Sequence, residues 1–191
     1  MRFILLSISL ITLAACQGEN DTNRTVDMYN TSGDMVGTVE LADSSDGVNV
    51  KIKLEGLEPG FHGIHVHEFP KCEPPSFESA GNHFNPDGSE HGLMHPKGAH
   101  LGDLPNIEAD GGGLVDAELM LPGATLLDGK NSLLRGDGTS IVVHEVQDDG
   151  VSQPSGESGA RILCGELKAN SEENKGESPT NPTENNKELK E

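Results

Sequence analysis

Histidine is the residue type with the most chemical potential in this sequence, and its distribution is uneven. All eight histidines of the 191-residue chain lie between His62 and His144. His65 and His67 flank a single valine, and side chains two positions apart in a strand point to the same face. These two imidazoles could therefore bind one metal ion, and His144, in another apolar segment, could approach the same ion.

A second set of potential ligands follows later in the chain and consists of His83, His91, His100 and Asp103. Neutral imidazoles together with one carboxylate suit a tetrahedral zinc ion. Sites made mainly of imidazole, without sulfur, also suit copper. The sequence therefore predicts two metal sites, one on strands and one in a loop.

The elements that must position these residues are short strands. Apolar and polar residues alternate repeatedly, as in half-buried antiparallel strands, and the 24 Gly and 11 Pro supply turns between them. The predicted strands are Val26–Asn30, Met35–Ala42, Val48–Glu55, Phe61–Glu68, Leu104–Asp110, Val115–Leu121, Ser140–Val146 and Ala160–Lys168. Eight short strands indicate an all-β, antiparallel β-sandwich or flattened barrel.

The segment Phe69–Asp103 shows no alternation, although it contains many Gly, Pro and His residues. A loop of this length inside a compact domain usually carries function. We expect a disulfide and a metal ion, rather than a strand ladder, to order it.

The two ends predict an exported protein. Residues 1–15 form an apolar segment too short to span a bilayer, which indicates a signal peptide. Leu13–Cys16 resembles a bacterial lipobox, so we expect lipidation of Cys16, attachment to the cell membrane facing outside the cytoplasm, and a polar tether over 16–25. An ordinary secretory signal is the alternative. The folded domain is placed at 26–169, and the polar segment 170–191 is expected to be a disordered acidic tail.

Charge and cysteines limit the function classes further. The net charge of −19 argues against a nucleic-acid partner and against electrostatic docking to anionic lipid headgroups. With Cys16 assigned to lipid, Cys72 and Cys164 remain, and two cysteines in an exported domain most simply form a disulfide. Two free buried thiols are the alternative.

Several motifs, in the same order along the chain, resemble the Cu,Zn superoxide dismutase family, in particular its exported bacterial branch. The resemblance covers about residues 26–169. The segments that carry it are Gly60–Glu68, Ser79–Pro86, His91–Asn106, Val142–Glu145 and Gly159–Gly165. It implies a Greek-key β-sandwich with long metal-binding loops, and dismutation of superoxide that protects the cell envelope.

The resemblance also assigns roles to individual residues. It implies copper bound by His65, His67, His83 and His144, and zinc bound by His83, His91, His100 and Asp103. His83 would bridge the two ions and take part in catalysis. Asp148 would orient ligand histidines of both sites, and Arg161 would guide the superoxide anion to the copper.

Three residues near these motifs are expected to play other roles. His62 is expected to be a core histidine bonded to the backbone, and His95 an exposed loop residue. Glu157 stands where asparagine would be expected, and a carboxylate there could oppose an anion if it faced the channel.

Other functions remain open at this point. A zinc or copper buffer would bind metal without turnover, and a structural lipoprotein would show no metal dependence. The sequence leaves the oligomeric state open between monomer and homodimer.

Overall fold

The computed structural model describes residues 23–169. The predicted signal peptide, lipidated Cys16 and tail therefore lie outside the described residues. Nine strands and one short 3-10 helix form the regular structure of residues 23–169. They are β1 (Arg24–Asn30), β2 (Met35–Ser44), β3 (Gly47–Leu54), β4 (Gly60–His62), β5 (Ile64–His67), η1 (Glu78–Ala80), β6 (Ile107–Ala109), β7 (Val115–Pro122), β8 (Gly138–His144) and β9 (Arg161–Lys168).

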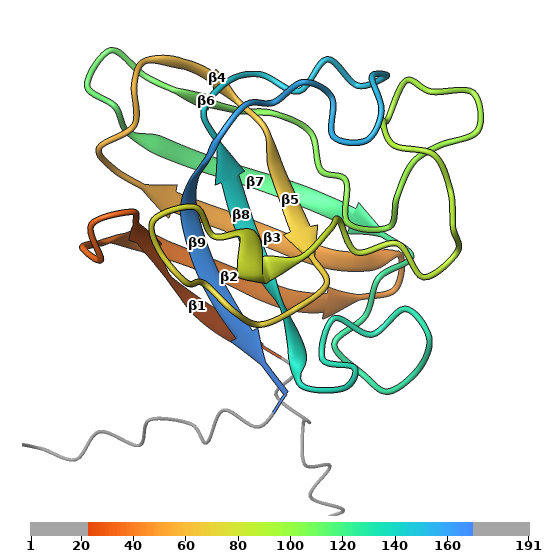
Figure 1. Cartoon of the computed structure of the whole chain (residues 1–191). Coiled ribbons are helices and arrows are strands. Elements are labelled where there is room, and N and C mark those ends of the chain that lie inside the picture. Colours follow the sequence, from red (N-terminus) through yellow and green to blue (C-terminus); the bar gives the residue numbers. More distant parts are fainter. Residues whose placement is uncertain (1–22, 170–191) are drawn as a thin grey trace, which may run out of the picture.

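Seven of the strands form one antiparallel sheet in the order β5-β8-β9-β1-β2-β3-β7, and β4 pairs with β6 in a small second sheet. The large sheet curls, so that β5, β8 and β9 cross over β2, β3 and β7 (Figure 1). The all-β antiparallel fold class predicted from the sequence is confirmed.

The core lies between the two halves of the curled sheet. Alternate residues of β3 point into it, among them Val50 and Ile52, which are fully buried. Ile64 of β5 and Ile141 of β8 enter the same core from the other side. The outward face of β5 is thereby free to carry functional side chains.

One predicted strand, Phe61–Glu68, is wrong as a single element. It divides at Gly63 into β4, which pairs with β6, and β5, which pairs with β8. A Cβ atom at residue 63 would lie 3.1 Å from the Cβ atom of Ser158, so the chain turns where glycine allows close approach.

Several predicted boundaries also shift, and the strand predicted at Ser140–Val146 is observed as β8, Gly138–His144. β1 begins at Arg24, inside the predicted tether, because Arg24 pairs with Leu41 of β2. The strand predicted at Leu104–Asp110 is reduced to β6, Ile107–Ala109. Within residues 23–169, no helix is long and apolar enough to cross a membrane.

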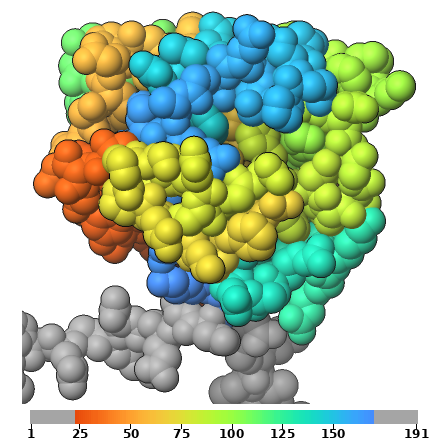
Figure 2. All heavy atoms as spheres, viewed as in Figure 1, coloured from red at the N-terminus to blue at the C-terminus, as the bar shows by residue number. Residues whose placement is uncertain are grey.

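The predicted disulfide is confirmed: Cys72 is bonded to Cys164 of β9, with 5.6 Å between their Cα atoms. It ties the start of the long loop to the outer face of the sheet. Phe77 and Ala80 pack there against Val142 and Cys164, in a small second core. In Figure 2 this yellow loop and the blue segment after β8 lie side by side on one face of the molecule.

Candidate metal centre

Three histidines reach the site from strands. In β5, Ile64 and Val66 enter the core, so His65 and His67 lie on the opposite face, fully buried beneath the long loop. Since β5 pairs with β8 in antiparallel register, the end of β8 brings His144 to the same face.

The loop reaches these strands by backbone pairing. β5 is an edge strand of the large sheet, and residues of the loop cover its free edge. The N–H of Phe84 donates to the carbonyl of Val66 at 2.7 Å, and the N–H of Val66 donates to Gly102 at 2.9 Å. His83 and Asp103 thus come to lie opposite His67 and His65 in two isolated bridges. The loop is therefore partly ordered by ladder bonds, which the sequence did not indicate.

The copper set predicted from the resemblance converges. One ring nitrogen from each of His65, His67, His83 and His144 lies within 4.8 Å of the others. In each ring one nitrogen contacts a protein oxygen: Asp148 for His65, Gly81 for His67, Asp103 for His83 and Gly159 for His144. The remaining nitrogens are buried without a hydrogen-bond partner: Nδ1 of His65 and Nε2 of His67, His83 and His144.

The zinc set predicted from the resemblance converges beside it, around a carboxylate. Oδ1 of Asp103 lies 2.8 Å from Nδ1 of His83 and 3.3 Å from Nδ1 of His100. Nδ1 of His91 lies 3.0 Å from Oδ2 without hydrogen-bond geometry. Oδ2 also accepts the N–H groups of Gly92 at 2.9 Å and His100 at 3.0 Å, so the carboxylate organises the loop as well as the ligands.

Asp148 joins the two sets. His65 Nε2 donates to its Oδ2 at 2.8 Å, and His91 Nε2 lies 3.2 Å from its Oδ1. The side chain of Asn106 holds the Asp148 backbone in a reciprocal pair, accepting its N–H and donating to its carbonyl, both at 2.9 Å. This positioning role of Asn106 was missed in the sequence, where it appeared only as part of a motif.

A second reciprocal pair fixes His91. The side chain of Gln153 accepts the backbone N–H of His91 at 2.8 Å and donates to its carbonyl at 2.9 Å. We call this contact the Gln153 clasp. Nothing in the sequence pointed to it, because the two residues are 62 positions apart.

The electrostatics of the two sets differ. Burial lowers the pKa of His144 to about 3, and that of His83 to about 4 although Asp103 opposes the shift. Burial also lowers the pKa of His91, but Asp103 and Asp148 outweigh it and raise the value to about 9. Burial would raise the pKa of both aspartates, yet their hydrogen bonds from histidines hold it well below its usual range. Burial thus favours the neutral form of the imidazoles of His83 and His144.

Arg161 owes its position to an irregular register. β8 and β9 pair regularly up to Val143 and Leu163, and the register then shifts so that His144 lies opposite Arg161. A shift of one residue exchanges the faces of a strand, so Arg161 joins the outer face. Its guanidinium donates to the carbonyls of Phe77 at 2.7 Å and Gly81 at 2.8 Å.

The carbonyl of Gly81 accepts a second bond, from Nδ1 of His67 at 3.0 Å. Gly81 has a φ of 79°, and a Cβ atom there would lie 2.6 Å from the ring of Phe69. Both facts require glycine at this position. One carbonyl therefore orients Arg161 and a ligand imidazole together.

An open pocket of about 500 Å³ leads to these side chains. Its lining includes His83, His100 and His144 from the ligand sets, with Arg161 and Glu68 on its wall. Glu157 is exposed and is not among the lining residues. The carboxylate in the pocket is that of Glu68, which the sequence analysis did not single out although it directly follows His67.

The two remaining histidines lie outside both sets. His62 is buried, with its ring nitrogens 2.8 Å from the carbonyls of His144 and Glu58, which confirms the predicted core position. His95 is half-buried rather than exposed, and its Nδ1 accepts the N–H of Lys97 at 3.2 Å.

Comparison with known proteins agrees with the geometry of the two ligand sets. The family model described as copper/zinc superoxide dismutase matches residues 35–167. The chain belongs to the copper/zinc superoxide dismutase family. As a member of this family it is an oxidoreductase that acts on superoxide.

Relatives support this assignment over most of the chain. "Superoxide dismutase [Cu-Zn] 2" of Aquifex aeolicus is 40% identical over 166 residues, 86% of this chain and 96% of the relative. The crystal structure of a SOD-like protein from Bacillus subtilis, 41% identical, has a TM-score of 0.73 and covers 75% of this chain and 97% of its own. Cu/Zn superoxide dismutase from Brucella abortus is 33% identical, with a TM-score of 0.65, covering 76% and 99%.

The residues present fit the two metals that the family name gives. Buried imidazole nitrogens without a partner are costly, so five such nitrogens in one place indicate a missing electrophile. Four belong to the all-imidazole set, which suits copper, and Nδ1 of His91 belongs to the set with a carboxylate, which suits zinc.

Proposed function

We propose that this chain converts two superoxide anions and two protons to dioxygen and hydrogen peroxide. The copper would be held by Nδ1 of His65 and Nε2 of His67, His83 and His144, and the zinc by His83, His91, His100 and Asp103. Bound copper would supply the one-electron chemistry, which zinc does not share. The observation that carries the proposal is the convergence of four buried ring nitrogens, each without a partner.

His83 has the special position in this arrangement because it belongs to both sets. Its Nδ1 faces Asp103 and its Nε2 faces the copper set. With the pKa of His83 lowered to about 4, the ring is neutral at physiological pH. We propose that His83 would help to hold both ions, and that its neutral ring can accept a proton at Nε2 and pass it toward the product.

Arg161 would receive the anion. Arg161 lines the pocket, and its guanidinium is held by two backbone carbonyls. On a chain of net charge −19, local cations decide anion capture, because charges farther away than ~8 Å are largely screened at physiological salt. The mechanism therefore needs Arg161 and the bound ions near the entrance.

Three matched histidine substitutions test the proposal. His144→Gln removes a residue of the copper set only, His100→Gln a residue of the zinc set only, and His95→Gln a histidine outside both. Copper content and superoxide consumption should be lost in His144→Gln, zinc content should fall in His100→Gln, and His95→Gln should match the wild type.

The opposite results have a clear meaning. Retained copper and activity in His144→Gln would contradict the ligand assignment. A wild-type protein that binds both metals but does not consume superoxide would instead be a metal buffer.

We also propose that the protein is exported and held on the cell membrane by lipid on Cys16, where it protects the envelope. The support is the sequence Leu13-Ala14-Ala15-Cys16 at the end of an apolar segment. Cys16→Ala in the full chain should move the protein from the membrane fraction to the soluble extracytoplasmic fraction. Unchanged membrane fractionation would contradict lipid attachment at this residue.

A further inference from the structure

The pocket before the ligand histidines contains two fixed charges of opposite sign besides its imidazoles. They are the guanidinium of Arg161 and the carboxylate of Glu68. Within residues 23–169, Glu68 forms no ion pair with either Arg161 or Arg135. Its negative charge therefore lies at the wall of this pocket without a paired cation in that part of the chain.

Glu68 is held firmly in this position. It follows β5 directly, and its own N–H donates to the carbonyl of Asn82 at 2.9 Å. Its Oε2 accepts the N–H of Asn82 at 3.1 Å, so the backbone and the side chain of Glu68 both form hydrogen bonds with Asn82. The carboxylate is thus fixed beside the turn whose Gly81 carbonyl holds Arg161.

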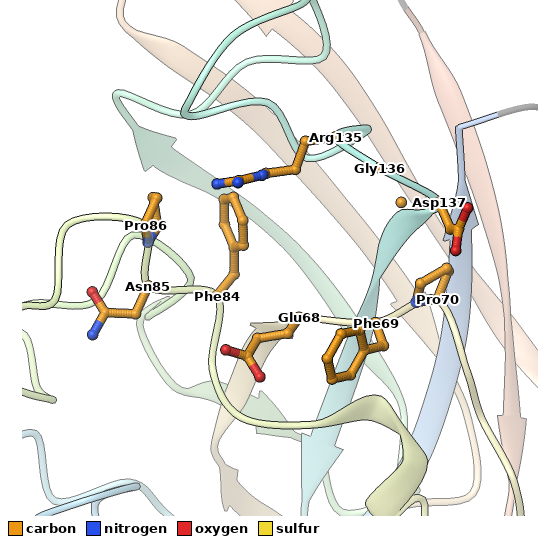
Figure 3. A pocket seen from close by; sticks show the side chains of 10 residues that line it. Glu68, Phe69, Pro70, Phe84, Asn85, Pro86, Arg135, Gly136 and Asp137 are labelled. Carbon is orange, nitrogen blue, oxygen red and sulfur yellow. The ribbon is translucent and has the colours of Figure 1, made fainter.

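Glu68 also forms a wall between two hollows. It lines the pocket before the histidines and a neighbouring pocket of about 470 Å³, which contains Arg135 and Phe69. Figure 3 shows the Glu68 carboxylate turned toward the side of Asn85, with the Phe84 ring between it and the Arg135 guanidinium. Asn85 lines both pockets as well, so the carboxylate lies at their shared rim.

We infer that Glu68 is a specificity-determining residue, which selects for singly charged anions at this entrance. Arg161 and two bound ions would attract every anion, and dianions most strongly. Coulomb energy is proportional to charge, so a fixed carboxylate opposes a dianion twice as strongly as superoxide. The inference rests on the proposed function, because it takes this pocket as the route of superoxide.

Glu68→Gln tests the inference with little structural change, because the glutamine oxygen can still accept the N–H of Asn82. For charges about 8 Å apart in water, loss of the carboxylate should raise the superoxide rate constant ~2-fold at low ionic strength. The affinity for azide, a monoanion, should rise by the same factor, and that for sulfate, a dianion, ~4-fold. Both affinities can be followed by visible absorption of the copper-loaded protein.

Glu55→Gln is the matched control. It removes the same charge from an exposed residue beside a different surface pocket, and it should change neither the rate nor the affinities. At ionic strength near 1 M, where the Debye length is ~3 Å, the differences between Glu68→Gln and wild type should vanish.

Three outcomes would overturn the inference: equal effects of the two substitutions, an effect of Glu68→Gln that persists at high salt, or equal shifts for azide and sulfate. If copper-loaded wild type consumed no superoxide, the proposed function would fail. The azide and sulfate titrations would still decide the role of Glu68.

Discussion

The two ligand sets share His83 but are built in different ways. His65, His67 and His144 stand on β5 and β8, where ladder hydrogen bonds and a packed core fix their backbone. His91 and His100 stand on a loop that depends on the carboxylate of Asp103 and on the Gln153 clasp. The difference teaches that the sheet fixes the backbone of three histidines of the copper set, whereas side-chain contacts must assemble the loop that carries His91 and His100.

The largest effect is expected when the disulfide that ties the loop to the sheet is removed. Replacement of both cysteines, Cys72→Ser with Cys164→Ser, opens a loop of 92 positions and should lower the free energy of unfolding by about 4–5 kcal/mol in the chain-entropy model. Urea denaturation of the metal-free protein measures it, with reduced wild type as the control. A loss below about 1 kcal/mol would show that the loop does not depend on the covalent tie.

The second prediction separates the two sets directly. Asp103→Asn removes the charge that organises the loop, and zinc affinity should fall ~100-fold or more, while the copper set keeps its strand positions. Competition with a chelator measures the affinity. Asp148→Asn is the matched control and should weaken both sites, because Asp148 contacts His65 and His91. Equal effects of Asp103→Asn on copper and zinc would contradict the division.

The pH dependence of the metal-free protein should show both sets. His83 and His144 have pKa values lowered to about 4 and about 3 from 6.5, so the unfolded state binds more protons below pH 6.5, and stability is lost as pH falls. His91 has its pKa raised to about 9, so the folded state binds more protons above 6.5, and stability is lost as pH rises.

Stability should therefore be greatest near pH 6.5, with slopes of ~1.4 kcal/mol per pH unit for each titrating proton. Denaturation series at several pH values measure the curve. His91→Gln should flatten only the alkaline side. An alkaline slope that survives this substitution would mean that another group causes it.

The Gln153 clasp offers a milder test of the loop. Gln153→Ala removes both hydrogen bonds to His91, together with one to the carbonyl of Val151, and should accelerate zinc release several-fold, for a loss of ~1 kcal/mol. Asn30→Ala, which breaks comparable side-chain bonds in the turn between β1 and β2, should leave zinc release unchanged. Stopped-flow measurements with a zinc indicator give the rate of zinc release for both variants. An equal acceleration in the two would show that the effect is only general destabilisation.

The smallest expected effect is at Glu157. Its φ of 51° is left-handed, a conformation that asparagine adopts more readily, so Glu157→Asn should stabilise the protein by ~0.5–1 kcal/mol. Because Glu157 does not line the pocket, the superoxide rate should stay the same at every ionic strength. A higher rate at low salt would show that this carboxylate does act on the anion.

The sequence predicted what depends on local patterns. Alternation located the strands, and the spacing of His65 and His67 placed both imidazoles on one face. Contacts between side chains and backbone groups that lie far apart in the sequence could not be predicted from it. The Gln153 clasp, the hold of Asn106 on Asp148 and the covering of β5 by Phe84 and Gly102 leave no periodic signal.

The register shift before His144 was equally hidden. If the pairing of β8 and β9 continued regularly beyond Val143 and Leu163, Ile162 rather than Arg161 would lie opposite His144. The family motif identified Arg161, whereas its position arises from one unpaired residue in the ladder. The division of β4 from β5 at Gly63 likewise follows from close packing against Ser158.

The carbonyl oxygen of Gly81 links two properties, anion capture and the orientation of a ligand ring, that would otherwise evolve separately. It accepts hydrogen bonds from the guanidinium that would capture the anion and from a ring that would bind the redox ion. A mutation that moves this turn to improve substrate capture would also tilt the imidazole of His67, and would thereby change the reduction potential of a copper ion held there. Adaptation to a new anion would therefore have to proceed through residues such as Glu68, whose charge can change while the turn stays in place.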